Sequence, residues 1–217
     1  YFQFQFLIFN IFFSPKKGTL TCNRQEFHQC SIGGKRYNAF EVKEEDNEKA
    51  EDYSLFFQAV NDQLKTEQLE GDVDEEKIKY REMMHFFLLT MSICNTVTIE
   101  RNINAPESSQ TEYLSESPDE TALVSAAAKS GYVLKYRSFE GIHLEIFGKV
   151  EEFRILALFP FSSDRKRMSI MIRSKSTQKI FLLTKGADET ILLRLSKDGL
   201  NLFYSILFIY LLFFQFF

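Results

Sequence analysis

The chain has 217 residues, of which 45% are hydrophobic and 26% are charged, and its formal net charge at pH 7 is −4. This composition excludes a wholly disordered chain and a collagen-like fibre, and the length is that of one domain or slightly more. The mildly acidic balance gives no general reason to expect a nucleic acid as partner, so any basic binding site must be local.

The two ends of the chain differ from its middle, because Tyr1–Phe13 and Leu200–Phe217 hold half of the 24 phenylalanines and no charged residue. The first end alternates Phe with Gln like a strand and lacks the features of a signal peptide. Within the second, Leu202–Phe217 would form a helix of about 24 Å, shorter than the roughly 30 Å of hydrocarbon in a bilayer. Insertion into a membrane, burial as core strands, and sequence outside the folded domain would each account for these ends. We favour the third and expect residues 1–13 and 200–217 not to belong to the fold.

The first half of the middle region contains helices. Short apolar stretches between glycines in Thr19–Tyr37 indicate strands and turns. Apolar positions in Tyr53–Leu64 fit a short amphipathic helix, and those in Glu76–Val97 form a face broad enough for a buried helix. Asn102–Leu114 is polar and is expected to be a surface loop.

The three cysteines are odd in number and lack the CxxC or histidine spacing of a metal site. They are Cys22, Cys30 and Cys94. We expect them to be free thiols, buried in a protein of a reducing compartment.

The sequence Ser117-Pro118-Asp119-Glu120 predicts the start of a helix that runs to Ser130 and ends at Gly131. Ser117 and Glu120 have the spacing of a capping box, in which the Glu120 side chain would bond to the Ser117 backbone N–H. Glu120 could also accept a hydrogen bond from an adenine amino group, and the two roles are compatible.

Five successive strands are indicated by β-branched and aromatic residues with short polar connections, which imply antiparallel neighbours. They are expected at Tyr132–Phe139, Ile142–Phe147, Phe153–Phe159, Met168–Arg173 and Lys179–Thr184. A last helix is expected at Ala187–Leu195. The fold class is therefore α/β, of the α+β type, with a twisted antiparallel sheet flanked by helices.

Two segments near the end of this region could contact a nucleotide. Phe161–Ser169 places one aromatic ring beside hydroxyl groups and three cations, which suits a stacked base next to phosphates, although a core phenylalanine before a solvated basic turn would give the same pattern. In Lys185–Asp188 the lysine could contact a phosphate and Gly186 could let the backbone approach it, although a surface lysine before a tight turn is equally ordinary.

Four segments in order resemble the P4-type subgroup of the P-type ATPases, the phospholipid flippases: Gly18–Asn23, Glu116–Glu120, Phe161–Ser169 and Lys185–Asp188. The resemblance covers about residues 18–199 and implies most of the ATP-binding domain of such an enzyme, incomplete at its C-terminal side. It implies that Glu120 contacts the adenine end, Phe161 stacks on the ring and Lys185 lies deep in the pocket, with Ser162 and Arg167 beside them. For the parent enzyme it implies Mg²⁺, phospholipid substrates, an accessory subunit, and a membrane location with this domain on the cytosolic side.

The chain departs from the family at the phosphorylation motif. The family has Ser-Asp-Lys-Thr-Gly-Thr-Leu-Thr, and its aspartate attacks the γ-phosphate to form an acyl phosphate. The matching stretch here is Ser14–Thr21, in which Pro15 stands at the nucleophile position and Lys17 replaces a threonine. We therefore expect no ATP hydrolysis by this route and assign no catalytic residue and no metal ligand.

The domain interpretation follows from these matches. Residues 14–36 are expected to be a remnant of the phosphorylation-motif region and hinge, and residues 37–199 a partial nucleotide-binding domain. Weak binding of an adenine nucleotide is the favoured function. The alternatives are a non-catalytic interaction module or a non-functional fragment of such a gene, with or without a membrane anchor formed by the C-terminal tail.

Overall fold

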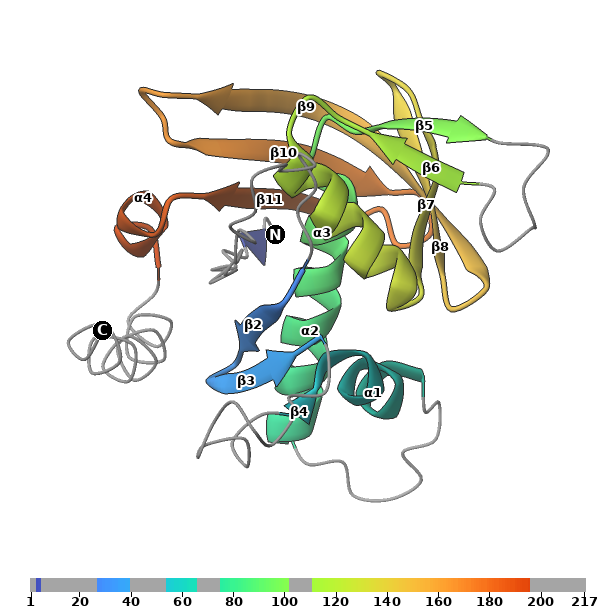
Figure 1. Cartoon of the computed structure of the whole chain (residues 1–217). Helices are drawn as coiled ribbons and strands as arrows, with labels where there is room; N and C mark the ends of the chain where they lie inside the picture. The colour runs from blue at the N-terminus through green and yellow to red at the C-terminus, as the bar shows by residue number, and fades with distance from the viewer. Residues whose placement is uncertain (1–2, 5–26, 40–53, 66–74, 102–110, 196–217) are drawn as a thin grey trace, which may run out of the picture.

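The computed structural model describes residues 3–4, 27–39, 54–65, 75–101 and 111–195. Within these ranges the main sheet has six strands in the order β1-β11-β10-β9-β8-β7 (Figure 1). Its strands are β1 (Gln3–Phe4), β7 (Tyr132–Arg137), β8 (Gly141–Ile146), β9 (Lys149–Ser162), β10 (Arg167–Ser174) and β11 (Ile180–Gly186). The strands β7 to β11 pair as antiparallel neighbours, as the short connections predicted.

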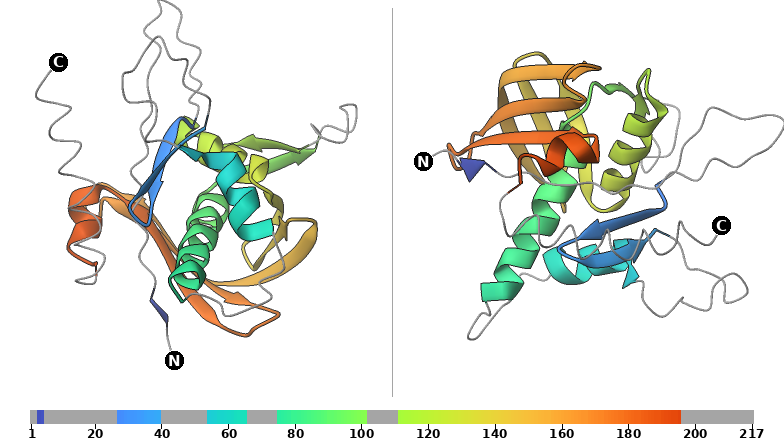
Figure 2. Two further views of the ribbon diagram at one scale, coloured as in Figure 1. Left: turned by 90° about the horizontal axis from the view of Figure 1, so that it is seen from below. Right: turned by 90° about the vertical axis from the view of Figure 1, so that its left-hand side faces the viewer.

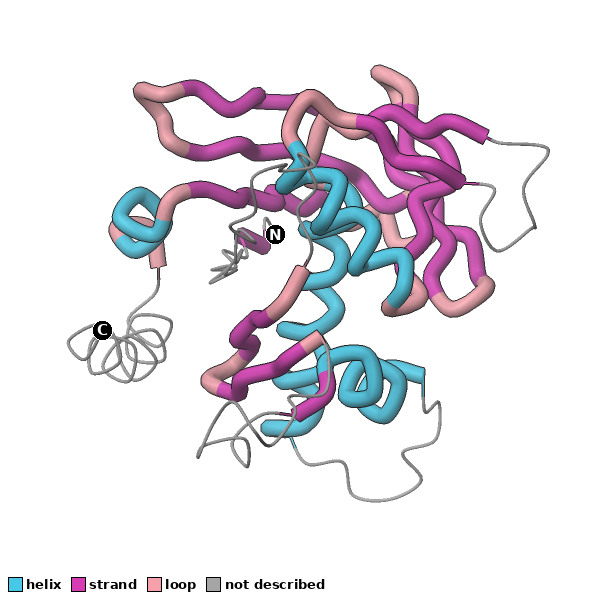
Figure 3. The backbone as a smooth tube through the Cα atoms, viewed as in Figure 1, coloured by secondary structure: helices cyan, strands magenta, loops and turns pink. Residues whose placement is uncertain are grey.

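Two helices cover one face of this sheet. The long helix α2 (Glu75–Ile93) contacts both β7 and β11, and the sheet curves around it (Figure 2). The second helix, α3 (Pro118–Lys129), lies against α2 and β7. The helices lie together on the concave side, as the colouring by secondary structure shows (Figure 3). Apolar residues of α2, α3 and the strands form one continuous core, which confirms the α+β fold class.

A smaller unit packs on the N-terminal half of α2. It contains β2 (Gln29–Ile32), β3 (Lys35–Asn38), β4 (Ser54–Leu55), α1 (Phe56–Val60) and a π-helical turn at Asn61–Lys65. The ring of Phe56 is fully buried, 5.1 Å from that of Phe27 and 6.1 Å from that of Phe87 on α2. The helix expected at Tyr53–Leu64 is therefore present but begins only at Phe56.

Several predicted boundaries were wrong. The segment expected as a surface loop contains β6 (Thr111–Leu114), which pairs with β5 (Thr98–Arg101) as an antiparallel hairpin. The long helix ends at Ile93 rather than Val97, and the last helix, α4 (Asp188–Leu192), is shorter than expected.

The strand expected at Phe153–Phe159 extends at both ends. Its partner β8 pairs with it only as far as Arg154. At Pro160 there is therefore no β8 residue that would need a backbone N–H from β9. The pairing with β10 skips from Phe159–Ser169 to Ser162–Arg167, and this β-bulge accommodates Pro160 within the strand. The proline therefore lies within β9 and does not end it.

The uncharged ends lie almost wholly outside the described residues. Gln3–Phe4 is the exception, since β1 pairs in parallel with β11, and these two residues add to the sheet although residues 1–13 were expected outside the fold. Pro15 and residues 200–217 are not described, so the proposed domain limits stay predictions. Among the helices of the described residues, none is both long and apolar enough to cross a membrane.

Candidate functional site

Phe161 lies at the end of β9 with 63% of its surface exposed. This exposure contradicts the alternative of a core phenylalanine. The bulge places Pro160 and Phe161 together opposite Met168 of β10, and Met168 in turn pairs with Lys185 of β11. Phe161, Met168 and Lys185 therefore lie in one row across three neighbouring strands.

The neighbouring row contains the two weaker candidates. Arg167 pairs with Ser162 on one side and with Gly186 on the other. Because successive side chains of a strand point to opposite faces, Ser162 and Arg167 project away from the face that holds Met168 and Lys185. The Arg167 side chain donates a hydrogen bond to the Arg165 carbonyl at 3.0 Å. The structure thus does not place these two residues on the face of the sheet that holds Lys185.

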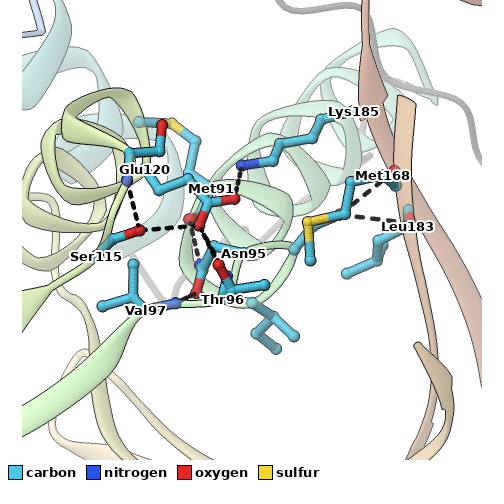
Figure 4. Close-up of polar contacts among 12 residues, drawn as sticks. Met91, Asn95, Thr96, Val97, Ser115, Glu120, Met168, Leu183 and Lys185 are labelled. Carbon is cyan, nitrogen blue, oxygen red and sulfur yellow. Dashed lines mark hydrogen bonds and ion pairs between the residues drawn. The ribbon is translucent and has the colours of Figure 1, made fainter. Parts of the chain in front are cut away.

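Glu120 reaches the same face of the sheet from the first turn of α3. Its Oε1 accepts a hydrogen bond from Lys185 Nζ at 2.8 Å (Figure 4). Its Oε2 accepts from the Thr96 backbone N–H at 2.9 Å, the Thr96 hydroxyl at 2.8 Å and the Ser115 hydroxyl at 3.3 Å. Four donors therefore surround this carboxylate.

The capping-box interpretation of Ser117 and Glu120 was wrong. Ser117 is the N-cap residue, but its side chain makes no capping hydrogen bond, and the Glu120 carboxylate turns to Thr96 and Lys185 instead. Pro118 at the first helical position and the left-handed Gly131 after the helix agree with the prediction.

The charge of Glu120 is stabilised by these contacts. Burial raises the pKa of this carboxyl, but attraction and hydrogen bonding by Lys185 and hydrogen bonds from Thr96 outweigh burial, and the net pKa lies below its ordinary value. The side chains of Lys185 and Glu120 are 19% and 11% exposed. The Glu120 carboxylate is therefore ionised at neutral pH, and its contact with Lys185 is only partly screened by water.

Lys185 lies above a buried thiol. Cys94 Sγ is 3.7 Å from the carbonyl oxygens of Met168 and Leu183, and burial raises the pKa of this thiol to about 11. Cys94 and Cys30 are both buried and free, as predicted, whereas Cys22 lies outside the described residues. Because the Cys94 thiol is uncharged, it does not balance the charge of Lys185, whereas the Glu120 carboxylate does.

Gly186 is required by the packing of the neighbouring hairpin. A Cβ atom there would lie 2.6 Å from the Lys166 carbonyl oxygen and 2.8 Å from Arg167 Cα. The glycine thus makes room for the β9–β10 hairpin, and its contact with a phosphate stays a prediction. Lys166 has a positive φ of 48°, its carbonyl accepts the Ala187 N–H at 3.0 Å, and its side chain pairs with Glu189 of α4. These contacts fix the hairpin that carries Phe161.

Thr96 and Ser115 are residues of the site that the sequence did not reveal. Thr96 follows the end of α2 and Ser115 precedes α3, and both donate to Glu120. A pair of short hydroxyl residues at the ends of two helices is too common to indicate a site. Their role depends on the packing of α3 against α2.

A metal ion has no evident ligands in this part of the chain. Among the described residues, no three His, Cys, Asp or Glu side chains gather in a way that could hold one.

Comparison with known proteins gives one family. The P-type ATPase cytoplasmic domain N matches residues 84–201. A phospholipid-transporting ATPase of Schizosaccharomyces pombe is 39% identical over 192 residues, covering 86% of this chain and 14% of that protein. The Homo sapiens protein named "Probable phospholipid-transporting ATPase IM" is 35% identical over 211 residues, covering 88% and 17% respectively. A phospholipid-transporting ATPase of Saccharomyces cerevisiae is 31% identical over 224 residues, covering 85% and 14%. The chain thus spans 14% to 17% of the length of these relatives.

Proposed function

Because this chain belongs to the P-type ATPases, in their phospholipid-transporting group, and carries their cytoplasmic domain N, we propose that it binds an adenine nucleotide on the concave face of its main sheet. One observation carries the proposal. The exposed ring of Phe161 lies in the same strand row as Lys185, and Lys185 is paired with Glu120.

Each of the three residues has a distinct task in this proposal. Phe161 offers its exposed face to the base, and stacking of this kind contributes about 1–3 kcal/mol. Lys185 supplies a positive charge to the phosphate groups, which are acceptors for its ammonium donors. Glu120 balances that charge before the nucleotide arrives. Among the described hydrogen bonds its Oε1 accepts only from Lys185, so this oxygen has a lone pair left to accept from the adenine amino group.

The role of the whole enzyme is a further part of the proposal. The names of the relatives describe phospholipid transport, and we infer that this domain serves a membrane-bound transporter of that kind from the cytosolic side, using Mg²⁺ and ATP and acting with an accessory subunit. With Pro15 at the nucleophile position, the chain itself binds the nucleotide without forming the acyl phosphate.

Calorimetric titration of the full chain with ATP tests the binding. Phe161→Leu should raise the Kd for ATP by about tenfold, because the loss of stacking costs roughly 1.4 kcal/mol. The control is Phe139→Leu, which changes a phenylalanine that is 87% exposed in the β7–β8 turn. This variant should bind like the original chain.

Three results would overturn the proposal. A chain that unfolds cooperatively but gives no heat of binding with ATP would support the alternative of a non-catalytic interaction module. Equal losses of affinity in Phe161→Leu and Phe139→Leu would show that the ring of Phe161 has no special place in binding. Loss of cooperative unfolding in the original chain would support the non-functional fragment.

A further inference from the structure

Arg137 at the end of β7 is a partly buried cation that belongs to no part of the proposed site. Its Nη1 donates to the Asn95 backbone carbonyl and, at 2.7 Å, to Asn95 Oδ1, and its Nη2 donates to the Ile93 carbonyl. Its Nε has no hydrogen-bond partner in the described part of the chain. Burial lowers the pKa of this guanidinium to about 10, which leaves it charged at neutral pH. A full positive charge is thus held against the carbonyl end of α2, where the helix dipole favours it.

Asn95 connects this cation to the turn between α2 and β5. Its Nδ2 donates to the Ser92 carbonyl at 2.9 Å and to the Met91 carbonyl at 3.2 Å. Its Oδ1, which also accepts from Arg137, accepts the Val97 backbone N–H at 3.2 Å. The backbone on both sides of Thr96 is therefore fixed by contacts that end at one guanidinium group.

Thr96 connects this fixed backbone to Glu120. Its backbone N–H and its hydroxyl both donate to Glu120 Oε2, so the pair of donors has one orientation relative to the carboxylate. Oε1 of the same carboxylate accepts from Lys185. Contacts between described residues thus run continuously from β7, at one edge of the main sheet, to β11 near the other.

We propose that Arg137 is a positioning residue for Lys185, acting through Asn95, Thr96 and Glu120. The inference rests on the proposed nucleotide site, because it assigns to Arg137 the placement of the cation that meets the phosphates. The simpler alternative is a helix cap that stabilises α2 and leaves Lys185 unaffected. The two differ in what happens to the Lys185 ammonium group when Arg137 is changed.

The decisive measurement is the side-chain 15N resonance of Lys185 Nζ in the full chain without nucleotide, assigned by its loss in Lys185→Met. An ammonium group held by Glu120 exchanges its protons slowly with water and gives a distinct signal. When the lysine is released, fast proton exchange with water averages this signal. Arg137→Met should shift this signal toward that of free lysines or broaden it beyond detection. Arg137→Lys keeps the charge but cannot reach both carbonyl groups at once, so it should give a smaller change in the same direction.

The matched control is Thr98→Val, which removes the hydroxyl of an exposed threonine two residues after Thr96. That hydroxyl donates to the Leu114 carbonyl at 3.2 Å and contacts neither Glu120 nor Lys185 among the described hydrogen bonds. Thr98→Val should leave the Lys185 signal in place, whereas Thr96→Val should move it. An unchanged signal in folded Arg137→Met and Arg137→Lys would overturn the proposal and leave Arg137 as a cap. If Arg137→Met does not fold, Arg137→Lys decides by the same criterion.

Nucleotide titration separates this inference from the proposed function. If the original chain binds ATP, Arg137→Met should raise the Kd by roughly tenfold, the size expected for coupling within one hydrogen-bonded network. If the original chain binds no ATP, the proposed function fails, while the Lys185 signal still decides whether Arg137 positions that residue. An unchanged Kd together with a shifted Lys185 signal would show that Lys185 is placed by Arg137 but does not contact the nucleotide.

Discussion

Glu120 shows how far a single residue could be anticipated. Its position in the first turn of a helix was predictable from Pro118 and from the helix-forming residues that follow. Its hydrogen bonds were not predictable, because Thr96 and Lys185 are distant in the sequence and meet Glu120 only after α3 packs on α2. The spacing of Ser117 and Glu120 favoured a capping box. In the structure Lys185 and the two donors of Thr96 stabilise the Glu120 carboxylate better than the helix N-terminus alone would.

The pH dependence of stability should reveal this carboxylate. Because the pKa of Glu120 in the folded chain is below its ordinary value, its contribution is complete above the pKa of the unfolded chain, about 4.3, and is lost as the pH falls through the folded value. At pH 7, Glu120→Gln should lower the free energy of unfolding by roughly 2 kcal/mol, because Lys185 loses its charged partner in a partly exposed site.

Urea-induced unfolding at pH 7 and at pH 3 measures the effect. The difference between the original chain and Glu120→Gln should shrink at the lower pH. Glu140→Gln, at an exposed position of the β7–β8 turn, serves as control and should have little effect at either pH. A difference that stays constant between the two pH values would contradict the assigned charge state.

At the scale of elements, helices and antiparallel strands with strong local patterns were predictable and their ends were less so. The helix α3 was anticipated closely because proline and glycine mark its limits. The hairpin β5–β6 was missed because its strands are four residues long and largely polar. The extent of β9 was missed because Pro160 normally ends a strand, and only the short partner β8 and the bulge make it acceptable.

The attachment of the small N-terminal unit to α2 depends on a few aromatic rings. Phe56→Ala should lower the free energy of unfolding by about 3–5 kcal/mol, because the ring is fully buried and contacts Phe27, Tyr37 and Phe87. Ile78→Ala on α2 is the control, since Ile78 is 44% exposed and should cost less than about 1 kcal/mol. Thermal unfolding of both variants checks the prediction, and equal shifts in Tm would contradict it.

At the scale of the whole molecule, the structure describes most of the cytoplasmic domain N of a P-type ATPase, whereas Pro15 lies outside the described ranges. The sequence alone locates Pro15 where the family has its aspartate. The prediction that the chain forms no acyl phosphate therefore rests on the sequence and not on the fold. It concerns the phosphorylation reaction and not the affinity for the nucleotide.

The full chain incubated with ATP and Mg²⁺ should form no acid-stable phosphorylated species that hydroxylamine releases, because proline has no group that can attack the γ-phosphate. Radiolabelled ATP followed by acid precipitation measures this directly, with a full-length phospholipid-transporting ATPase as the positive comparison. Hydroxylamine-sensitive label on this chain would contradict the assignment and point to another carboxylate as nucleophile.

The half-paired stretch of β9 also bears on how the chain behaves in solution. Among the strands of the described residues, only β10 pairs with β9 beyond Arg154, although the Ile155 N–H also donates to the Glu140 carbonyl, and Leu156, Leu158 and Phe159 are exposed. A flat apolar strand with a free edge would be a template for aggregation. Pro160 has no backbone N–H to donate, and the bulge in the β9–β10 pairing bends the strand. The bulge at Pro160 and Phe161 therefore also makes it unfavourable for a second molecule to add a strand to β9.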